Sequence, residues 1–300
     1  MPKFIIRHPE KEELLDAIKL IYRSANDLRL KSGRKPWDSA ITEVPPIFYH
    51  MLEHDRGGHW AAYSEQKMIG YGSALMRGKQ WYLAYLFVDP RFQAKGVGRQ
   101  LLQKCLDYGK GKADSWALAT FPYNEAALAL YSSFGMMPQA PIFEMHKKIG
   151  RPDDIKATGL RIEEDKSKAV LSKINKLEKE IRGYTRFGDW RFFSKTPEHK
   201  ICQFYSGSTW VGYSLVIRDS LIAPAGTTNK KYLPDIVTES VRLCLNSNPK
   251  MIRMWVGGSN GDVYQRLISM GFRINEMLVF LSTKPYGDLQ RYCPAYLSMF

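Results

Sequence analysis

A short basic segment with two glycines, residues 88–102, has the residue types and spacing needed to bind an anion. It reads as the end of a strand, a glycine-containing loop and the start of an amphipathic helix. Glycines let the backbone approach a ligand closely, and the first N–H groups of a helix attract negative charge. The candidate residues for binding a pyrophosphate are Gln93, Ala94, Lys95, Gly96, Val97, Gly98 and Arg99.

A second segment, residues 124–136, has the pattern of a helix that carries one polar aromatic side chain. Asn124 is a candidate N-cap, apolar residues recur every three or four positions, and Gly135 is a natural C-terminal stop. Tyr131 lies on the apolar face. The spacing predicts a helix over residues 124–134 that is followed by a strand.

Together, the two segments resemble motifs of the GNAT superfamily of acyl-CoA-dependent N-acetyltransferases. The loop spacing Gln-x-x-Gly-x-Gly differs from the Walker loop and from the dinucleotide-binding pattern. It is similar to the family's Gln/Arg-x-x-Gly-x-Gly/Ala loop, which binds the pyrophosphate of coenzyme A. The Asn, the apolar helix, the Leu-Tyr pair and the closing Gly of residues 124–135 are similar to the family's later motif. The resemblance covers residues 1–150.

The resemblance implies a role for each candidate residue, with acetyl-CoA as the co-substrate. The strand end formed by Leu86, Phe87 and Val88 would leave backbone groups free for the pantetheine arm and for the thioester carbonyl. Asn124 would contact the pantetheine amides, or serve only as a helix cap. Tyr131 would protonate the leaving thiolate, since a phenol titrates near ~10 and a thiol near ~8.5; the alternative is a packed aromatic side chain.

No general base is evident. The strand over residues 81–88 contains no carboxylate, and helical geometry is expected to turn Glu125 toward solvent. A water relay, or an amine that is already neutral when it binds, would serve equally well. The expected function is direct acetyl transfer from acetyl-CoA to a primary amine. The acceptor stays open between a small amine, an aminoglycoside-like compound, and a protein N-terminus or lysine. The alternative is a CoA-binding sensor or assembly module without turnover.

The elements that must position these residues follow from hydrophobic periodicity. The first half predicts strands over residues 3–8, 59–64, 68–77, 81–88, 115–121 and 141–147, helices over 12–30, 98–108 and 124–134, and an irregular stretch over 31–57. After a linker the pattern begins again, with strands over 160–164, 200–205, 209–217, 221–225, 251–256 and 272–281, and helices over 170–181, 232–245 and 263–270.

The second half reads as a degenerate copy of the first. Asn260 precedes Gly271 by the same number of residues as Asn124 precedes Gly135, and Leu267 stands at the position of Tyr131. Residues 224–229 contain no Gln-x-x-Gly-x-Gly pattern. The predicted fold class is therefore α/β, with two GNAT-like domains that each have a twisted mixed sheet flanked by helices. The predicted boundaries are 1–149, a linker over 150–159, and 160–300.

Composition sets the remaining expectations. The net charge of +14 attracts anions, but the sequence has no zinc finger, RNP motif or basic tail, so specific nucleic-acid binding is not expected. No apolar run is long enough for a membrane helix, and no signal peptide is recognised. Four scattered cysteines favour reduced thiols and a cytoplasmic location. His50 and His54 have the spacing of a metal pair on a helix, but no further ligand completes a site, so no metal is expected.

Overall fold

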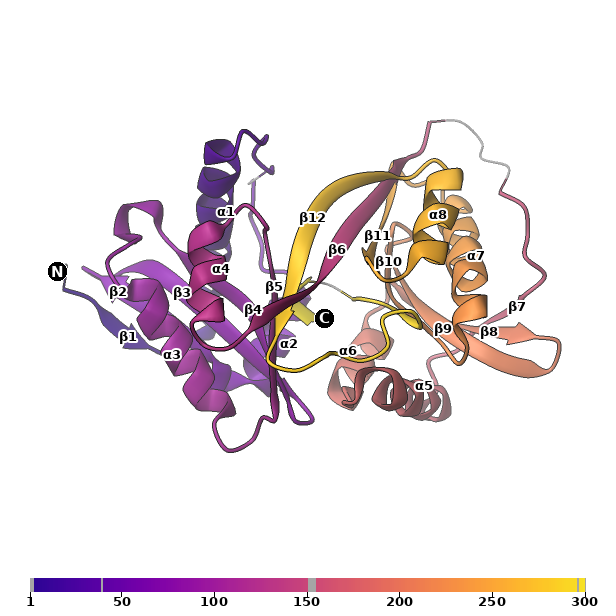
Figure 1. Ribbon diagram of the computed structural model, residues 1–300, viewed down its shortest axis with the longest axis horizontal. Helices are drawn as coiled ribbons and strands as arrows, with labels where there is room; N and C mark the ends of the chain where they lie inside the picture. The colour runs from indigo at the N-terminus through magenta and orange to yellow at the C-terminus, as the bar shows by residue number, and fades with distance from the viewer. Residues whose placement is uncertain (1–2, 39, 151–154, 296, 300) are drawn as a thin grey trace. The chain divides into compact units, whose positions relative to one another are not determined.

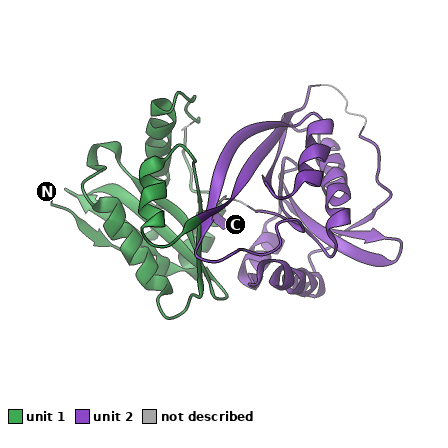
Figure 2. Ribbon diagram, in the orientation of Figure 1, with its two compact units in different colours: residues 1–137 green, residues 138–300 purple. Residues whose placement is uncertain are grey.

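The computed structural model describes residues 3–38, 40–150, 155–295 and 297–299. The chain divides into two compact units, residues 1–137 and residues 138–300 (Figure 2). The mixed α/β organisation predicted from the sequence, with two compact units, is confirmed.

Unit 1 is built on a five-stranded mixed sheet in the order β1-β2-β3-β4-β5 (Figure 1). All neighbours are antiparallel except β4 and β5, which are parallel. The strands are β1 (Ile5–Arg7), β2 (His59–Ser64), β3 (Lys67–Arg77), β4 (Gln80–Val88) and β5 (Ser115–Thr120). The helices are α1 (Leu14–Lys31), α2 (Pro46–His54), α3 (Val97–Gly109) and α4 (Glu125–Ser132).

Helices cover both faces of this sheet. On one face α3 packs so closely on β3 that a Cβ on Gly72 would lie 2.9 Å from the sulfur of Cys105. On the other face Phe48 of α2 stacks on Tyr85 of β4, with ring centroids 5.1 Å apart. Because neighbouring side chains of a strand point to opposite faces, Leu86 joins the cluster under α3 instead. The end of β4 is therefore held from both sides.

The strands of unit 2 follow the order β12-β6-β11-β10-β9-β8-β7, with the short strand β13 beside β10. The strands are β6 (Met137–Lys148), β7 (Arg161–Glu164), β8 (His199–Ser206), β9 (Thr209–Ile217), β10 (Leu221–Thr227), β11 (Met251–Gly257), β12 (Arg273–Ser282) and β13 (Tyr292–Cys293). The helices are α5 (Lys168–Arg182), α6 (Phe187–Lys195), α7 (Leu233–Leu245) and α8 (Gly261–Ser269). Its core is formed by α7, α8 and the central strands.

The two units repeat one order of elements, and α8 repeats α4 in detail. Asn124 and Asn260 both cap their helices by accepting a hydrogen bond from the N–H three residues on. Gly135 and Gly271 both end the following turn at positive φ, 80° and 85°. Leu267 takes the place of Tyr131, because the N–H groups of Met136 and Phe272 bond to the carbonyls of these two residues.

Strand β6 lies elsewhere than the sequence boundary suggests. The predicted boundary at residue 149 leaves the strand over 141–147 in the first domain. In the structure, residues 142–148 of β6 pair antiparallel with β11 along its whole length, so β6 belongs to unit 2 and the division falls at residue 137. Of the predicted linker over 150–159, residues 151–154 lie outside the described residues.

The prediction of an irregular stretch over residues 31–57 was wrong in its last part, because α2 occupies Pro46–His54. Pro46 stands in the first turn, where a missing N–H costs nothing, and Phe48, Met51 and Leu52 supply a buried face. In unit 2, the sequence reading also left out α6. Its Trp190 and Phe193 are fully buried, and this packing outweighs weak helix propensity.

Candidate functional site

Strands β4 and β5 pair with each other only along the first half of β4 and then diverge. We call this point of divergence, with residues 84–88 of β4 beyond it, the first fork. The parallel pairing of β4 and β5 runs from Gln80↔Ser115 to Leu83↔Leu118. Beyond it β4 continues to pair with β3 as far as Val88↔Gly70, with a register shift that leaves Ala84 as a bulge residue. A bulge bends and twists its strand. Within the described part of unit 1, residues 84–88 therefore pair with β3 on one side but do not pair with β5 on the other.

The far end of this edge is fixed by hydrogen bonds. The carbonyl of Val88 accepts one from the Ser24 hydroxyl of α1, at 2.9 Å, and one from Nε2 of Gln93, at 3.1 Å. Leu86, Phe87 and Val88 are each half-buried. Sequence reasoning missed Ser24, since nothing in the pattern of α1 sets one serine apart from an ordinary helix residue.

Asp89 anchors the turn that leads into the glycine loop. Its side chain is 1% exposed, and its carboxylate accepts hydrogen bonds from Arg91 and forms an ion pair with Arg23 at 2.9 Å. Hydrogen bonding from Arg91, aided by the charge of Arg23, lowers the pKa of Asp89 to about 2. The carboxylate is therefore ionised at neutral pH, and it holds the short 3-10 turn η3 (Pro90–Phe92).

The loop itself has the backbone of an anion site. Ala94 and Gly96 adopt positive φ values of 57° and 83°, and Gly96 is the N-cap of α3 without any side-chain cap. The first N–H groups of a helix have no partner inside it, so those of α3 point out of the loop. At Gly98 an added Cβ would meet only Val88 Cγ2, at 3.6 Å. The protein's own packing therefore does not require a glycine at this position.

Two cations stand beside the loop in fixed positions. Lys95 donates to the carbonyl of Arg91 at 2.7 Å, with its ammonium over the Phe92 ring. Arg99 donates to the Ser133 hydroxyl at 3.3 Å and lies over the ring of Phe134. Both side chains are exposed. Arg99 thereby connects the start of α3 to the end of α4.

Asn124 and Tyr131 lie on α4, which follows β5 directly. Asn124 accepts from the N–H of Ala127 at 3.2 Å, which leaves its amide NH₂ outside the cap. Tyr131 is 5% exposed, and burial raises the pKa of its phenol above the usual value, with a smaller contribution from Cys105 of α3. The phenol therefore keeps its proton at neutral pH. Glu125, in the first turn of α4, is exposed, as expected.

Among the histidines, His50 and His54 do lie on a helix, with ring centroids 4.2 Å apart. In the described part of the chain, no group of three His, Cys, Asp or Glu side chains could hold a metal ion. His59 is fully buried, next to the Tyr71 hydroxyl, 2.8 Å from its Nδ1. Burial lowers the pKa of His59 to about 4. It is thus a neutral interior residue at the start of β2.

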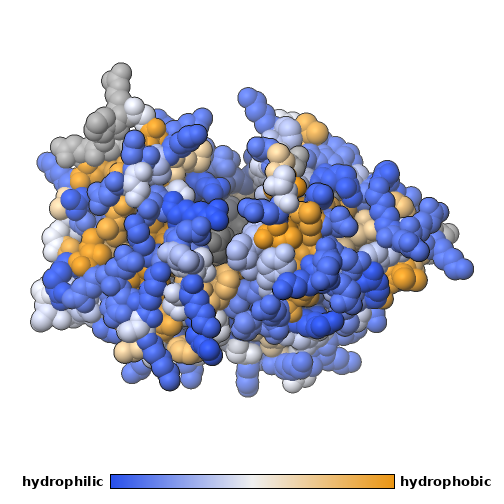
Figure 3. Space-filling model, turned by 180° about the vertical axis from the view of Figure 1, so that it is seen from behind, coloured by the Kyte–Doolittle hydropathy of each residue, from blue (hydrophilic) through white to orange (hydrophobic). Residues whose placement is uncertain are grey.

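Hydrophilic residues cover most of the face drawn in Figure 3, with smaller hydrophobic areas in both units. No helix in the described residues is long and apolar enough to cross a membrane.

Residues 22–136 match the family model of the acetyltransferase (GNAT) family. The chain is 30% identical over 113 residues to the N-alpha-acetyltransferase RimI of Mycobacterium tuberculosis, a match that covers 36% of this chain and 66% of the relative. It is 29% identical over 115 residues to human N-acetyltransferase 8, over 34% of this chain and 51% of the relative. The matched segment thus spans less than two thirds of either protein.

Solved structures resemble the whole chain. A putative acetyltransferase from Pyrococcus horikoshii has a TM-score of 0.77 at 14% identity, over 99% of this chain and 96% of its own. A tandem GNAT protein from the clavulanic acid biosynthesis pathway has a TM-score of 0.59 at 12% identity, over 94% of this chain and 99% of its own. At these identities the likeness concerns the fold, and it extends over both units.

Proposed function

We propose, because residues 22–136 match the family model of the GNAT acetyltransferases, that unit 1 transfers an acetyl group from acetyl-CoA directly to a primary amine. The observation that carries the proposal is the first fork together with the glycine loop that opens α3. One feature offers a strand edge beyond the ladder with β5, and the other offers the first N–H groups of a helix, and both lie within fifteen residues of chain. A long donor with a pyrophosphate at one end and amides along its arm fits this pairing.

The loop would bind the pyrophosphate. Its residues are Gln93, Ala94, Lys95, Gly96, Val97, Gly98 and Arg99. The first N–H groups of α3 would meet the phosphate oxygens, with Lys95 and Arg99 adding charge at the rim. The open space at Gly98 supports this, since a glycine that the protein's own packing does not require is explained by a ligand that comes close.

The edge formed by Leu86, Phe87 and Val88 would receive the pantetheine arm and the thioester. Backbone N–H groups on a strand held from both faces are preorganised donors for the negative charge that develops on the carbonyl oxygen. The two hydrogen bonds to the Val88 carbonyl support this role, because they fix the end of the edge before any ligand binds. The amide of Asn124 would donate to a carbonyl of the arm.

Tyr131 would act as the general acid. When the amine attacks the thioester carbon, the C–S bond breaks and the sulfur leaves as a thiolate that needs a proton. Its raised pKa keeps Tyr131 protonated until that moment. The base that takes the proton from the amine is not assigned to a residue. All four cysteines are free and buried, which is compatible with a reducing compartment such as the cytoplasm.

Calorimetric titration of acetyl-CoA into the full chain tests the donor site. Two glycines with positive φ flank α3, Gly96 at its start and Gly111 just past its end. A Cβ would meet only Nε2 of Gln100, at 3.9 Å, at Gly96, and nothing within 4 Å at Gly111. Gly96→Glu places a carboxylate against the pyrophosphate and is expected to weaken binding roughly 10²-fold or more. Gly111→Glu imposes the same backbone strain away from the loop, so its affinity should match that of the wild type. Absence of binding to the wild type, or equal losses in both variants, would refute the site.

The transfer step needs its own assay. Full-length protein is incubated with acetyl-CoA and a panel of amines that includes small polyamines, an aminoglycoside and peptides with free N-termini. Release of free CoA together with an acetylated amine, detected by mass spectrometry, is the expected result. Tight binding of acetyl-CoA without turnover on any amine would favour the non-catalytic sensor.

A further inference from the structure

Unit 2 has a second fork, formed where β10 and β11 diverge, and a later segment of the same chain lies in it. Strand β10 pairs in parallel with β11 only at Leu221↔Arg253 and Ile222↔Met254. Beyond a register shift between Ile222 and Ala225, the freed edge of β10 pairs antiparallel with β13 instead. This second fork thus contains a segment of the same chain, residues 286–293, with Leu289 against Gly257 at the end of β11.

The two forks correspond residue by residue. In each fork, one strand first pairs in parallel with its partner strand, then has a bulge, and then no longer pairs with that partner. In each, the asparagine that caps the next helix lies six residues after the last paired residue of the partner strand. The matching sets are Leu83, Leu118 and Asn124 in unit 1, and Ile222, Met254 and Asn260 in unit 2. By this correspondence, Cys293 and Tyr292 pair with residues at the places of Leu86 and Phe87.

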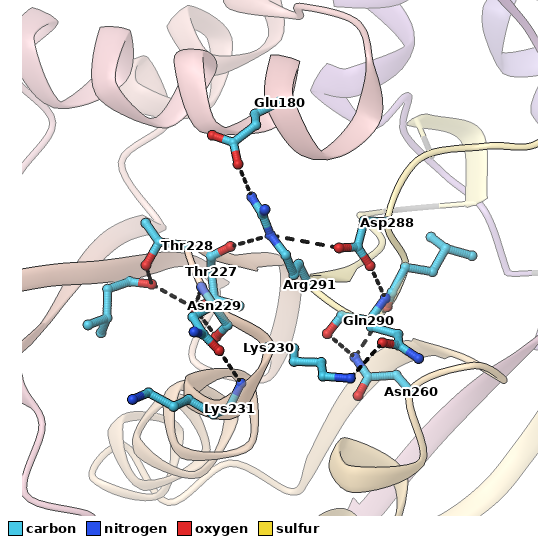
Figure 4. A network of polar contacts seen from close by, with 12 residues as sticks. Glu180, Thr227, Thr228, Asn229, Lys230, Lys231, Asn260, Asp288, Gln290 and Arg291 are labelled. Atoms are coloured by element: carbon cyan, nitrogen blue, oxygen red, sulfur yellow. Dashed lines mark hydrogen bonds and ion pairs between the residues drawn. The ribbon is translucent and has the colours of Figure 1, made fainter.

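Segment 286–293 uses its backbone as an amide ligand would (Figure 4). The N–H of Thr227 donates to the carbonyl of Arg291 at 3.1 Å, and Nε of Arg291 donates to the carbonyl of Thr227 at 3.2 Å. Thr227 stands at the place of Val88. The segment therefore takes the hydrogen bonds that unit 1 is proposed to offer to its donor.

Asn260 extends the correspondence between the two forks. Its side-chain oxygen accepts from Val263 N–H as a helix cap, and its NH₂ donates to the carbonyls of Leu289 and Gln290, both at 3.3 Å. Asn124 has the same cap and the same backbone angles, near −100° and +70°. An asparagine at this place can thus cap its helix and bind the carbonyls of an amide chain in the fork at the same time.

The phosphate end of the second fork is closed by other residues. In place of the glycine loop stands η4 (Lys230–Tyr232), where the side chain of Asn229 accepts from the N–H of Lys231 at 3.1 Å. Pro234 then removes one N–H from the first turn of α7. The ammonium of Lys230 contacts Oε1 of Gln290, which belongs to the segment itself. At the corresponding place in unit 2, one backbone N–H group is therefore hydrogen-bonded to Asn229 and another is missing because of Pro234.

The segment is anchored by buried groups. The Tyr292 hydroxyl accepts from Arg186 at 2.9 Å, and the Tyr286 hydroxyl accepts from Arg182 at 2.7 Å. Both arginines contact the fully buried carboxylate of Glu178. On the exposed side Arg291 pairs with Glu180 at 2.7 Å. An exchange of this segment for a soluble ligand would uncover two buried tyrosines and two buried arginines.

We propose that segment 286–293 is the resident ligand of the second fork, lying where the amide arm of an acyl-CoA lies in the first. Unit 2 accordingly binds no acyl-CoA, and the chain has one donor site. The comparison with a donor arm rests on the proposed function, whereas the occupancy of the second fork does not.

Hydrogen exchange on the full chain, read by mass spectrometry with and without saturating acetyl-CoA, tests this proposal. Peptides over 221–229 and 286–293 should be protected in the ligand-free protein and unchanged by acetyl-CoA. Peptides over 84–99 should gain protection when it binds, with one equivalent bound per chain in a parallel calorimetric titration. Two equivalents, or a change at 221–229 on adding acetyl-CoA, would overturn the proposal, as would a segment 286–293 that exchanges like an unfolded peptide.

A matched pair of variants sharpens the test. Asn260→Asp keeps the helix cap but loses the NH₂ that holds two carbonyls, so segment 286–293 should exchange about tenfold faster or more while the affinity for acetyl-CoA stays the same. Asn124→Asp makes the same change at the first fork and should lower that affinity without altering exchange at 286–293. An Asn260→Asp protein with unaltered exchange at this segment would count against the proposal. If acetyl-CoA binds nowhere, the proposed function fails, and the exchange data alone still decide whether the segment occupies the second fork.

Discussion

The first and the second fork share their strands, bulge and capping asparagine, yet one presents a freed edge and the other holds a peptide. In the described part of unit 1, the edge at residues 84–88 pairs with no further strand on the side of β5. In unit 2 the same edge pairs with β13. The difference shows that the bulged, parting strands belong to the fold itself, which keeps them where no donor loop exists.

A few residues separate the two forks chemically. Gly96 and Gly98 open the helix of unit 1, whereas Asn229 and Pro234 close the corresponding turn in unit 2. Tyr131 gives way to Leu267, which removes the proposed acid. Packing of the sheet against its helices can be maintained without any of these residues. The donor-binding chemistry is therefore separable from the scaffold, and each variant below tests one side of that division.

The largest effect is expected from Glu178→Gln in unit 2. The substitution keeps the shape but leaves two fully buried arginines without their counter-charge, and breaking such a buried pair costs about 3–5 kcal/mol. Urea unfolding with hydrogen exchange as the local probe should show unit 2 destabilised by this amount. Glu13→Gln is the control in unit 1, where the partner Arg7 is 44% exposed and a change below about 1 kcal/mol is expected. Equal effects would mean that the buried cluster does not anchor unit 2.

A smaller effect is expected from Tyr131→Phe, which removes only the hydroxyl. Loss of a general acid should lower kcat roughly 10²-fold and leave the KM for acetyl-CoA unchanged. A Tyr205→Phe variant controls for a phenol elsewhere in the chain. The reciprocal change Leu267→Tyr should create no activity and should destabilise unit 2 by about 1–3 kcal/mol, because Leu267 lies in a filled core. Unchanged kcat in Tyr131→Phe would remove this residue from the mechanism.

Local patterns explain what the sequence could predict. The caps at Asn124 and Asn260, the glycine stops and the glycine loop depend on neighbours within a few residues, so they are visible in the sequence. The predicted cap at Asn124, the predicted stop at Gly135 and the predicted loop before α3 are confirmed. The chemical roles of the loop, of Asn124 and of Tyr131 stay predictions.

Long-range pairing explains what the sequence could not predict. The bulge at Ala84 follows from the register of β3 against β4, and β13 pairs with a strand about seventy residues earlier in the chain. Neither leaves a periodic signal. The two helices left out of the prediction, α2 and α6, stand at the same place in the repeat, and both form through buried aromatic or apolar side chains despite a proline or glycine near their starts. Tertiary packing decides such segments.

At neutral pH the smallest effect is expected for a feature that the two units share. His59 opens β2 and His199 opens β8, and burial lowers the pKa of each to about 4. The folded protein thus holds both as neutral imidazoles, while the unfolded chain protonates them near ~6.5. Stability is therefore full above about pH 6.5 and is lost as the pH falls toward 4, by at most about 1.4 kcal/mol per pH unit for each histidine.

His59→Gln and His199→Gln should each flatten this slope in their own unit, measured as the difference from wild type so that carboxylate titration cancels. For His59, burial lowers the pKa, whereas the charge of Asp55 and the carbonyl of Met51 raise it. The change of stability with pH that depends on His59 therefore measures the balance of these contributions. If both variants kept the wild-type slope, the shared histidine would not be a source of acid sensitivity in either unit. If only one slope flattened, the two scaffolds would differ in the solvation of this strand start as well as in their forks.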